Sequence, residues 1–304
     1  MNTDGIYVTL STFSKESPQP EDLLKQSGIR YGVNPTGKRI VGDELVERSR
    51  GYQVLVAGVE EYTTEIMDQL PGLKAISRCG VGTEAIDHEA ALERGIAILN
   101  TPQEPVQAVA ELTLSLMFAL MRELPRLDML TREKQWKRIT GHLLSEQRVG
   151  LIGLGRIGQT VAKMLQGIGA EVIGYDPAGF APAGVEMVSS LSELLEKSQI
   201  VSIHAAPGSV YLDKALLQQI PKGSWVVNTS RGGMLDEAAL LELLDADELS
   251  GAALDVFSEE PYRGALCDSD KVVLTPHQAT LTVETRVAME SKAVQNAIDY
   301  LKGV

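Results

Sequence analysis

Three residues suited to acid–base chemistry follow predicted β-strands in the C-terminal half of the sequence: Arg231, Glu260 and His277. A histidine beside a carboxylate can hold and transfer a proton, and a guanidinium can grip a carboxylate and stabilise a developing oxyanion. Taken alone, an arginine such as Arg231 is more often a surface ion-pair partner. A glutamate such as Glu260 is more often part of a solvated acidic loop, and a single histidine is usually structural. Cys79 is a weak candidate for a nucleophile, because the sequence places no histidine beside it. His204 fits a packing residue at a strand end better than a second acid. The joint position of the first three at strand ends indicates a site for a small carboxylic acid.

A glycine pattern upstream indicates a dinucleotide site. Gly153, Gly155 and Gly158 form G-x-G-x-x-G after an apolar run and before a helical pattern. The first glycine permits a tight turn, the second lets the backbone approach a diphosphate at the helix N-terminus, and the third allows close packing. Asp176, 18 residues after Gly158, would accept ribose hydroxyls and repel a 2′-phosphate, which favours NAD over NADP. The alternative is that Asp176 only starts a turn before Pro177.

Short β-rich runs alternate with longer helical patterns, which predicts an α/β protein with parallel sheets covered by helices. Most runs are apolar throughout, as expected for strands buried on both faces. The predicted strands are 54–57, 74–77, 96–99, 149–153, 172–175, 200–204, 225–228, 252–256 and 272–275. The predicted helices include 84–94, 106–124, 157–168, 236–245 and 283–301.

The helix predicted over residues 106–124 is apolar on more than one face. It is either a core helix or a helix buried between two subunits, and an exposed apolar patch of that size is unusual on a monomer. Segment 100–105 contains two prolines and precedes this helix, so it is a plausible crossing between domains. The length of 304 residues fits two domains.

Composition excludes several classes of protein. The 28 basic and 41 acidic residues give a net charge of −13, which argues against nucleic-acid binding because phosphates require a basic face. Two cysteines are too few for a disulfide framework or a four-ligand zinc site, and no metal site is predicted. The 10-residue apolar stretch 112–121 is shorter than the ~20 residues that span a bilayer, and no signal-peptide pattern begins the chain. We therefore expect a soluble cytoplasmic protein.

These motifs together resemble the D-isomer-specific 2-hydroxyacid dehydrogenase family. The matching segments are GLIGLGRIG at 150–158, YDP at 175–177, NTSRGG at 228–233, LDVFSEEP at 254–261 and TPH at 275–277. They stand in family order, and the resemblance covers essentially the whole chain. The segment SRCGVGTEAID at 77–87 is similar to the family's substrate loop. NPTG at 34–37 and the ending from His277 to Arg286 resemble the phosphoglycerate dehydrogenase-like branch.

The resemblance implies two Rossmann-like domains with parallel sheets. A flavodoxin-like substrate domain would comprise residues 1–99 and 280–304, with the NAD-binding domain, residues 100–279, inserted into it. The resemblance also implies a homodimer formed through the cofactor domain. Helix 106–124 and the following arm, with Trp136, would form the interface.

The resemblance also assigns roles to individual residues. Arg231 would bind the substrate carboxylate and keto oxygen, His277 would be the general acid–base, and Glu260 would be its partner. Cofactor contacts would come from Gly153, Gly155, Arg156, Ile157, Gly158, Asp176, Thr229, Ser230 and, at the nicotinamide carboxamide, Asp255. Substrate contacts would come from Arg78, Gly80, Val81 and Gly82.

The implied activity is hydride transfer between NAD(H) and a short D-2-hydroxy or 2-keto acid. The first candidate substrate is similar to 3-phosphoglycerate, with Arg78, Lys38 and Arg39 as anion contacts. Glyoxylate or hydroxypyruvate reduction is the alternative within the family. A non-catalytic, NAD-sensing protein of the corepressor type is an alternative of another class, which the intact Arg–Glu–His set disfavours. Gln278 and Val106 depart from the family pattern, which bears on substrate identity and nicotinamide contacts but not on the fold.

Overall fold

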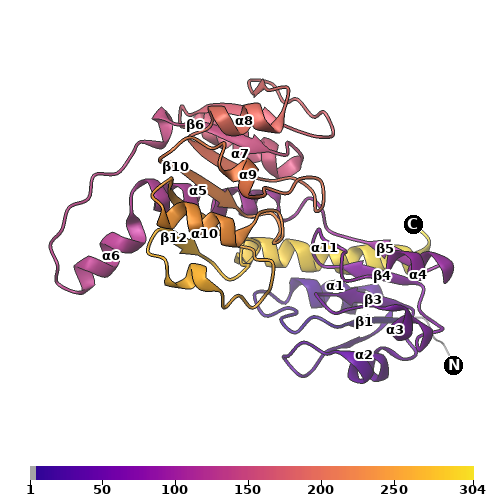
Figure 1. The fold of residues 1–304 in the computed structure, drawn as a ribbon. Coiled ribbons are helices and arrows are strands. Elements are labelled where there is room, and N and C mark those ends of the chain that lie inside the picture. Colours follow the sequence, from indigo (N-terminus) through magenta and orange to yellow (C-terminus); the bar gives the residue numbers. More distant parts are fainter. Residues whose placement is uncertain (1–4) are drawn as a thin grey trace. The chain divides into compact units, whose positions relative to one another are not determined.

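The computed structural model describes residues 5–304. It contains two β-sheets, each made of parallel strands and covered by helices (Figure 1). This confirms the predicted α/β fold class. The chain forms two compact units, one made of the segment up to Pro105 together with Thr280–Val304, the other of Val106–Ala279. The first unit thus extends a few residues beyond the crossing expected after residue 99. The reason is that Thr101 pairs with Gly80: the Thr101 N–H donates to the Gly80 carbonyl, and the Gly80 N–H donates to Thr101 Oγ1.

The first unit is built on a five-stranded parallel sheet in the order β2-β1-β3-β4-β5. Its strands are β1 (Gly5–Val8), β2 (Arg30–Val33), β3 (Val54–Ala57), β4 (Ala75–Arg78) and β5 (Ala97–Leu99). The chain order reverses at β1, which has β2 on one side and β3 on the other. Ligands bind outside the carboxyl ends of strands at such a switch point, so the loops after β1, β3 and β4 are the ones positioned to hold a substrate.

Helices cover both faces of this sheet because successive strand residues point to opposite sides. Ile6 and Val8 pack with Ala293 of the last helix, whereas Tyr7 packs with Leu45 on the other face. The helices of this unit are α1 (Gln19–Ser27), α2 (Gly42–Ser49), α3 (Thr64–Asp68), α4 (His88–Glu93) and α11 (Val283–Lys302). Helix α11 contacts α1, β3 and β4, so the amphipathic last segment returns to the first unit.

The second unit is built on a seven-stranded parallel sheet in the order β12-β11-β10-β9-β6-β7-β8. Its strands are β6 (Arg148–Ile152), β7 (Glu171–Tyr175), β8 (Glu186–Met187), β9 (Ile200–Ile203), β10 (Ser224–Asn228), β11 (Leu249–Leu254) and β12 (Val272–Leu274). Its helices are α5 (Val106–Met121), α6 (Leu124–Arg132), α7 (Arg156–Gly167), α8 (Leu191–Lys197), α9 (Lys214–Leu217) and α10 (Glu237–Asp245), with 3₁₀ turns η1 (Leu144–Glu146) and η2 (Ala265–Asp268). Helices α5 and α7 share one core layer with Leu151, and α8 and α10 share the other with Ile152.

An arm, residues 122–143, leaves the body of the second unit after α5 and carries α6 (Figure 1). The predicted helix 106–124 was too long at its C-terminal end. It stops at Met121 because Glu123 adopts the left-handed conformation, with φ +52°, and α6 then begins at Leu124 with Pro125 in its first turn. Every residue from 131 to 138 is exposed, and Trp136 is 82% exposed.

Two other sequence expectations differ from the structure. The helix predicted to begin at residue 84 begins at His88, because the Asp87 carboxylate caps it by accepting the Ala90 N–H at 2.9 Å. Strands β1, β2 and β8 are absent from the predicted set; each has four residues or fewer. No helix of the described residues combines the length and apolar character needed to span a bilayer.

Docking of α11 on the first sheet supplies a stability test. Ala293 is fully buried, and its carbonyl accepts a hydrogen bond from Ser77 Oγ at 2.8 Å. Ala293→Leu inserts a side chain where there is no room, so the free energy of unfolding should fall by about 1–3 kcal/mol in urea titrations. Lys292→Ala, on the exposed neighbour, should change it by less than about 0.5 kcal/mol. Equal effects of the two changes would contradict this packing.

Candidate active site

The glycine-rich loop after β6 has the shape of a diphosphate cradle. Gly153 has φ +91°, and a Cβ there would lie 2.5 Å from the Ala205 nitrogen. A Cβ on Gly158 would lie 2.1 Å from the Gly153 carbonyl oxygen, so α7 packs on the loop only with glycine at that position. A Cβ on Gly155 would meet nothing within 4 Å. The loop is therefore tightly packed at Gly153 and Gly158 and open at Gly155. No side chain caps the N-terminus of α7, so the first N–H groups of this helix are left for an anion.

Asp176, directly after β7, is held against this loop. Its Oδ2 accepts the Leu154 N–H at 2.5 Å, and its Oδ1 accepts the Ala178 N–H at 2.7 Å. The carboxylate therefore also organises the turn that the alternative interpretation predicted. A carboxylate oxygen has two lone pairs, so both oxygens can still accept ribose hydroxyls. The loop and Asp176 fit a dinucleotide with an unmodified 2′-hydroxyl.

Arg231 lies in the loop between β10 and α10, and Asn228 at the end of β10 orders this loop. Asn228, 1% exposed, donates from Nδ2 to the Arg231 carbonyl at 2.8 Å, and its Oδ1 accepts the Ser230 N–H and hydroxyl. A Cβ on Gly232 would lie 1.6 Å from the Phe257 carbonyl oxygen. Glycine at that position therefore lets the arginine loop press against the segment leading to Glu260. The predicted arginine and glutamate are thus brought to neighbouring loops of one unit.

His277 and Glu260 form a hydrogen-bonded pair. The His277 Nδ1 lies 2.7 Å from Glu260 Oε2, and the other carboxylate oxygen, Oε1, accepts the Phe257 N–H at 3.1 Å. An ionised carboxylate only accepts, so Nδ1 donates and Nε2 is left for a substrate. The side chains are 49% and 37% exposed. A proton on this imidazole is therefore both held by a carboxylate and within reach of a ligand.

A buried carboxylate fixes the histidine loop, residues 275–279. Asp255 is fully buried; its Oδ1 accepts Thr275 Oγ1 at 2.6 Å and the Gln278 N–H at 2.9 Å, and its Oδ2 accepts the Ala279 N–H at 3.0 Å. The His277 N–H donates to the Asp255 carbonyl at 2.8 Å. These bonds hold His277 at φ +49°, a left-handed conformation that is costly for a residue with a Cβ. Asp255 thus positions the acid–base group, and its expected contact with the nicotinamide stays a prediction.

The other expected nicotinamide contacts are Thr229 and Ser230, in the loop that follows β10. Thr229 is 5% exposed, and its hydroxyl lies 2.8 Å from that of Thr113 in α5. The Ser230 hydroxyl donates to Asn228 Oδ1. Both side chains are thus engaged within the unit, and so is the Ser230 backbone, because its N–H donates to Asn228 Oδ1 and its carbonyl accepts from the Arg231 guanidinium. Contact of these two residues with the nicotinamide stays a prediction.

Two titratable residues are poorly suited to the chemistry that the sequence raised for them. Burial lowers the pKa of His204 to about 4, its Nε2 lies 2.9 Å from Ser202 Oγ, and its Nδ1 has no partner among residues 5–304. An imidazole with this pKa is neutral at pH 7 and lacks the second ring proton that a general acid donates. Burial raises the pKa of the Cys79 thiol to about 12, so this cysteine stays protonated and is not a nucleophile.

The substrate loop of the first unit, residues 78–82, follows β4. The N–H of Gly80, at φ +141°, donates to Thr101 Oγ1 at 2.7 Å, and Asn100 Nδ2 donates to the Val81 carbonyl at 2.8 Å. The Arg78 guanidinium folds over the loop and donates to the Cys79 carbonyl. Within the described chain, the N–H groups of Val81 and Gly82 have no acceptor. These two are the better candidates to bind a substrate carboxylate.

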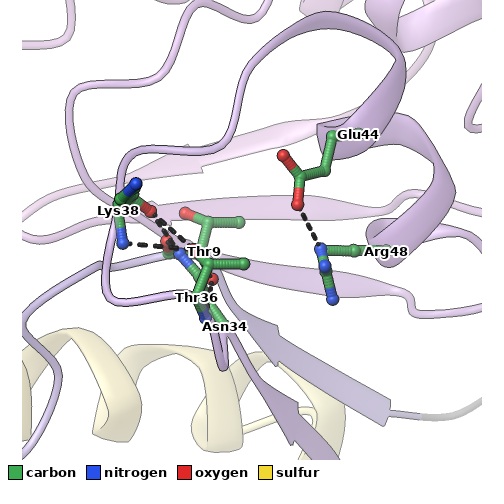
Figure 2. Close-up of polar contacts among 6 residues, drawn as sticks. All are labelled: Thr9, Asn34, Thr36, Lys38, Glu44 and Arg48. Atoms are coloured by element: carbon green, nitrogen blue, oxygen red, sulfur yellow. Dashed lines mark hydrogen bonds and ion pairs between the residues drawn. The ribbon is translucent and has the colours of Figure 1, made fainter.

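A second ordered loop, residues 34–38, ends β2 (Figure 2). Asn34 Nδ2 donates to the Thr9 and Lys38 carbonyls at 2.9 and 2.8 Å, and Asn34 Oδ1 accepts the Thr36 N–H and hydroxyl. These bonds fix the backbone from which Lys38 and Arg39 project. Arg39 lies 3.8 Å from a carboxylate oxygen of Glu61.

Sequence reasoning missed Glu60, a buried carboxylate in the loop after β3. It is 3% exposed, and its Oε2 accepts the Gly58 N–H at 2.7 Å and Thr9 Oγ1 at 3.0 Å. Strand β3 pairs with β4, with Ala57 opposite Arg78, so the loop that carries this carboxylate lies next to the substrate loop that follows β4. The sequence signal that could have indicated this carboxylate is Gly58 followed by Glu60 and Glu61, just after the apolar run 54–57. Among the described residues, no three His, Cys, Asp or Glu side chains form a metal-binding group.

The second unit combines a parallel sheet, a glycine cradle, an acidic residue at the next strand end and an acid–base pair, which together define a nicotinamide-dependent dehydrogenase domain. Residues 114–279 match the family profile described as "D-isomer specific 2-hydroxyacid dehydrogenase, NAD binding domain". The chain therefore belongs to the D-isomer specific 2-hydroxyacid dehydrogenase family, and its second unit contains that family's NAD-binding domain. This confirms the predicted family and cofactor.

Individual relatives agree with this assignment. The chain is 36% identical to the D-3-phosphoglycerate dehydrogenase of Methanocaldococcus jannaschii over 94% of this chain and 56% of that enzyme. It is 37% identical to the glyoxylate reductase of Thermofilum pendens over 86% of this chain and 82% of that enzyme. A crystal structure of a protein from Thermus thermophilus superposes with a TM-score of 0.89 and 33% identity, covering 98% and 97% of the two chains. The chain spans about half the length of the D-3-phosphoglycerate dehydrogenases it matches.

Asp176 should determine cofactor choice. The parent protein should bind NADH at least about tenfold more tightly than NADPH, since a difference of ~1.4 kcal/mol is a factor of ten and a 2′-phosphate would meet this carboxylate. Asp176→Ala should erode the preference, as measured by fluorescence titration with each nucleotide. Glu171→Ala, at the start of the same strand, is the control. Equal affinities in the parent protein would show that Asp176 does not face the ribose.

Substitutions should separate the roles of the acid–base residues. His277→Ala removes the proton donor, so keto-acid reduction should slow by ~10²–10⁴-fold while NADH binding is nearly unchanged. Arg231→Ala should lose both rate and substrate affinity, because the guanidinium contacts ground state and transition state alike. Steady-state kinetics and nucleotide titration measure both. Full turnover by His277→Ala would overturn the assignment.

The charge of Glu260 should set the pH range of reduction. Glu260→Gln keeps a hydrogen-bond acceptor beside Nδ1 but removes the negative charge that stabilises the imidazolium. Reduction needs the protonated imidazole, so its rate should fall off at lower pH than in the parent protein. Glu259→Gln, one residue out of register and exposed, should leave the pH profile unchanged. The reverse pattern would mean that the wrong glutamate has been assigned.

Proposed function

We propose that this protein is an NAD-dependent dehydrogenase of a short D-2-hydroxy acid, working in either direction. The observation that carries the proposal is the 2.7 Å pair of His277 and Glu260 on the same sheet as the glycine cradle. All strands of that sheet are parallel, so β6, β10, β11 and β12 end at one edge. Cofactor, arginine, glutamate and histidine loops therefore share the edge at which ligands bind.

The residues account for the chemistry in the reduction direction. Bound NADH supplies the hydride for the carbonyl carbon. Arg231 holds the substrate carboxylate and stabilises the charge that develops on the keto oxygen. His277 gives the Nε2 proton to that oxygen, while Glu260 holds the Nδ1 proton and stabilises the imidazolium before transfer. In the oxidation direction His277 accepts the hydroxyl proton instead.

The first candidate substrate is a phosphorylated acid similar to 3-phosphoglycerate. Lys38 and Arg39, on the loop that Asn34 orders, and Arg78 supply the cations for its phosphate and carboxylate. The curated relatives named D-3-phosphoglycerate dehydrogenase support this choice at 36% identity.

A specific observation favours the second candidate, an unphosphorylated substrate such as glyoxylate or hydroxypyruvate. Glu60 and Glu61 follow the strand next to the substrate loop, and Glu61 lies within 3.8 Å of Arg39. Negative charge at this edge opposes a phosphate, and like charges in low-dielectric surroundings repel strongly. The relative named glyoxylate reductase matches over 82% of its own length.

The proposal includes a homodimer formed through the cofactor domain and a cytoplasmic location. The exposed arm with Trp136, Leu124 and Met129 supports the dimer, because apolar side chains gathered on a projecting segment are typical of an interface. The unpaired thiols of Cys79 and Cys267 fit a reducing compartment.

One assay tests the function and selects between the substrates. NADH oxidation should be measured with glyoxylate, hydroxypyruvate and its 3-phosphate ester, with His277→Ala as the control for adventitious turnover. The proposal predicts turnover of at least one 2-keto acid that the control lacks. A kcat/KM at least about tenfold higher for the phosphate ester selects the first candidate; the opposite order selects the second. NADH binding without turnover of any keto acid would instead support a nucleotide-sensing protein.

A further inference from the structure

Glu60, in the loop after β3, is a buried carboxylate without a paired cation in the described chain. It is 3% exposed, and it forms no ion pair within residues 5–304; Arg39 pairs with Glu61 instead. A buried carboxylate is costly unless it is paired or fully hydrogen-bonded. The fold therefore maintains an uncompensated negative charge at the edge of the first sheet where ligands are expected.

Among the described residues, donors occupy only one oxygen of this carboxylate. Oε2 accepts the Gly58 N–H at 2.7 Å and the Thr9 hydroxyl at 3.0 Å. Oε1 accepts no hydrogen bond from residues 5–304, yet it is not among the unpartnered atoms that are sealed from solvent. The side chain is thus held through one oxygen and presents the other as an open acceptor.

The loop that carries Glu60 is joined to the segment that continues the substrate loop of the same unit. The Tyr62 N–H donates to the Ala85 carbonyl at 2.8 Å, and the Asp87 N–H donates to the Tyr62 carbonyl at 3.0 Å. The Tyr62 side chain is fully buried in the core beneath. Glu60, two residues before this anchor, is therefore fixed beside the substrate loop.

The spacing of the strands sets how far Glu60 lies from a substrate carboxylate. Strands β3 and β4 are neighbours in the sheet, with Ala57 opposite Arg78. Neighbouring strands lie ~4.8 Å apart, which is about the length of a three-carbon acid from its carboxylate to its C3 substituent. A substrate whose carboxylate binds the open N–H groups of Val81 and Gly82 can therefore place its tail beside the loop of Glu60.

We infer that Glu60 determines specificity by accepting a hydrogen bond from the tail of the substrate. The inference rests on the proposed dehydrogenase function and narrows its substrate to a 2-keto acid, or the matching 2-hydroxy acid, with a hydroxyl or ammonium donor on C3. A hydrogen bond to an ionised group is roughly twice as strong as one between neutral groups. A phosphate ester brings further negative charge to this oxygen, and a methyl group leaves it unpaired, so the site rejects both.

Reversing the polarity of one atom tests this role. In Glu60→Gln the amide oxygen can keep the bonds from Gly58 and Thr9, so the NH₂ group replaces Oε1 and offers a donor where the parent protein offers an acceptor. The matched substrates are hydroxypyruvate and 3-fluoropyruvate, which are similar in size but differ in having a donor. The ratio of their kcat/KM values should fall at least about tenfold in Glu60→Gln. Loss of folded protein cancels within each ratio, and carbonyl reactivity cancels between the two proteins.

A second glutamate supplies the control. Glu65→Gln removes an exposed charge in α3 and should leave the ratio unchanged. 3-Aminopyruvate distinguishes the two donors: a kcat/KM above that of hydroxypyruvate identifies an ammonium tail, and a lower one identifies a hydroxyl tail. An unchanged ratio in Glu60→Gln, or an equal fall in Glu65→Gln, would overturn the inference.

Calorimetric titration of the protein saturated with NAD separates this inference from the proposed function. D-Glycerate carries the tail hydroxyl that D-lactate lacks, so the parent protein should bind glycerate at least about tenfold more tightly, and Glu60→Gln should remove the difference. If no 2-keto acid is turned over but this preference is present, the proposed dehydrogenase fails and the role of Glu60 stands. Turnover of keto acids with equal binding of the two hydroxy acids would leave the dehydrogenase standing and contradict the role of Glu60.

Discussion

The site depends on one buried carboxylate, that of Asp255. Three donors of the histidine loop converge on it, and its own carbonyl accepts the His277 N–H. A fully buried carboxylate is costly unless it is hydrogen-bonded, so the strand end and the loop stabilise each other. This set of bonds compensates for the left-handed backbone at His277 and aims its ring at Glu260. Strain at the acid–base residue is thus sustained by the rigid sheet beneath it.

The same logic extends along both sheets, where short polar side chains at strand ends position the loops that face a ligand. Asn228 orders the arginine loop, Asp176 the glycine loop and Asn34 the loop that carries Lys38. Each is directly or nearly at the end of a strand whose apolar residues fill the core. The parallel strands of one sheet end at the same edge. Hydrogen bonds that order each loop therefore bring functional groups that are far apart in the sequence to the same edge of their sheet.

Much of this arrangement could be predicted from the sequence, because strand ends and glycine spacing are local signals. The apolar runs located nine strands, and the order of motifs indicated which side chains share an edge; the fold class and family were confirmed. The predictions failed for features that depend on tertiary contacts and for strands whose apolar pattern in the sequence is weak. Strand β2 lies at the sheet edge, is partly exposed and contains Arg30 and Gly32, so it lacks a continuous apolar pattern. The break at Glu123 is a backbone conformation that its residue type does not specify. The bracing roles of Asn228 and Asp255, and the buried Glu60, depend on which donors the fold brings to them.

The central claim is that a braced His277 donates from Nδ1 to Glu260 and leaves Nε2 for the substrate. Nitrogen-15 NMR of the four histidine rings tests this directly, with His277→Gln used to assign the resonances. The account predicts that neutral His277 is the Nδ1–H tautomer, with a hydrogen-bonded proton that disappears in Glu260→Ala and loses its fixed position in Asp255→Ala. An Nε2–H tautomer, or a ring that responds to neither substitution, would contradict it.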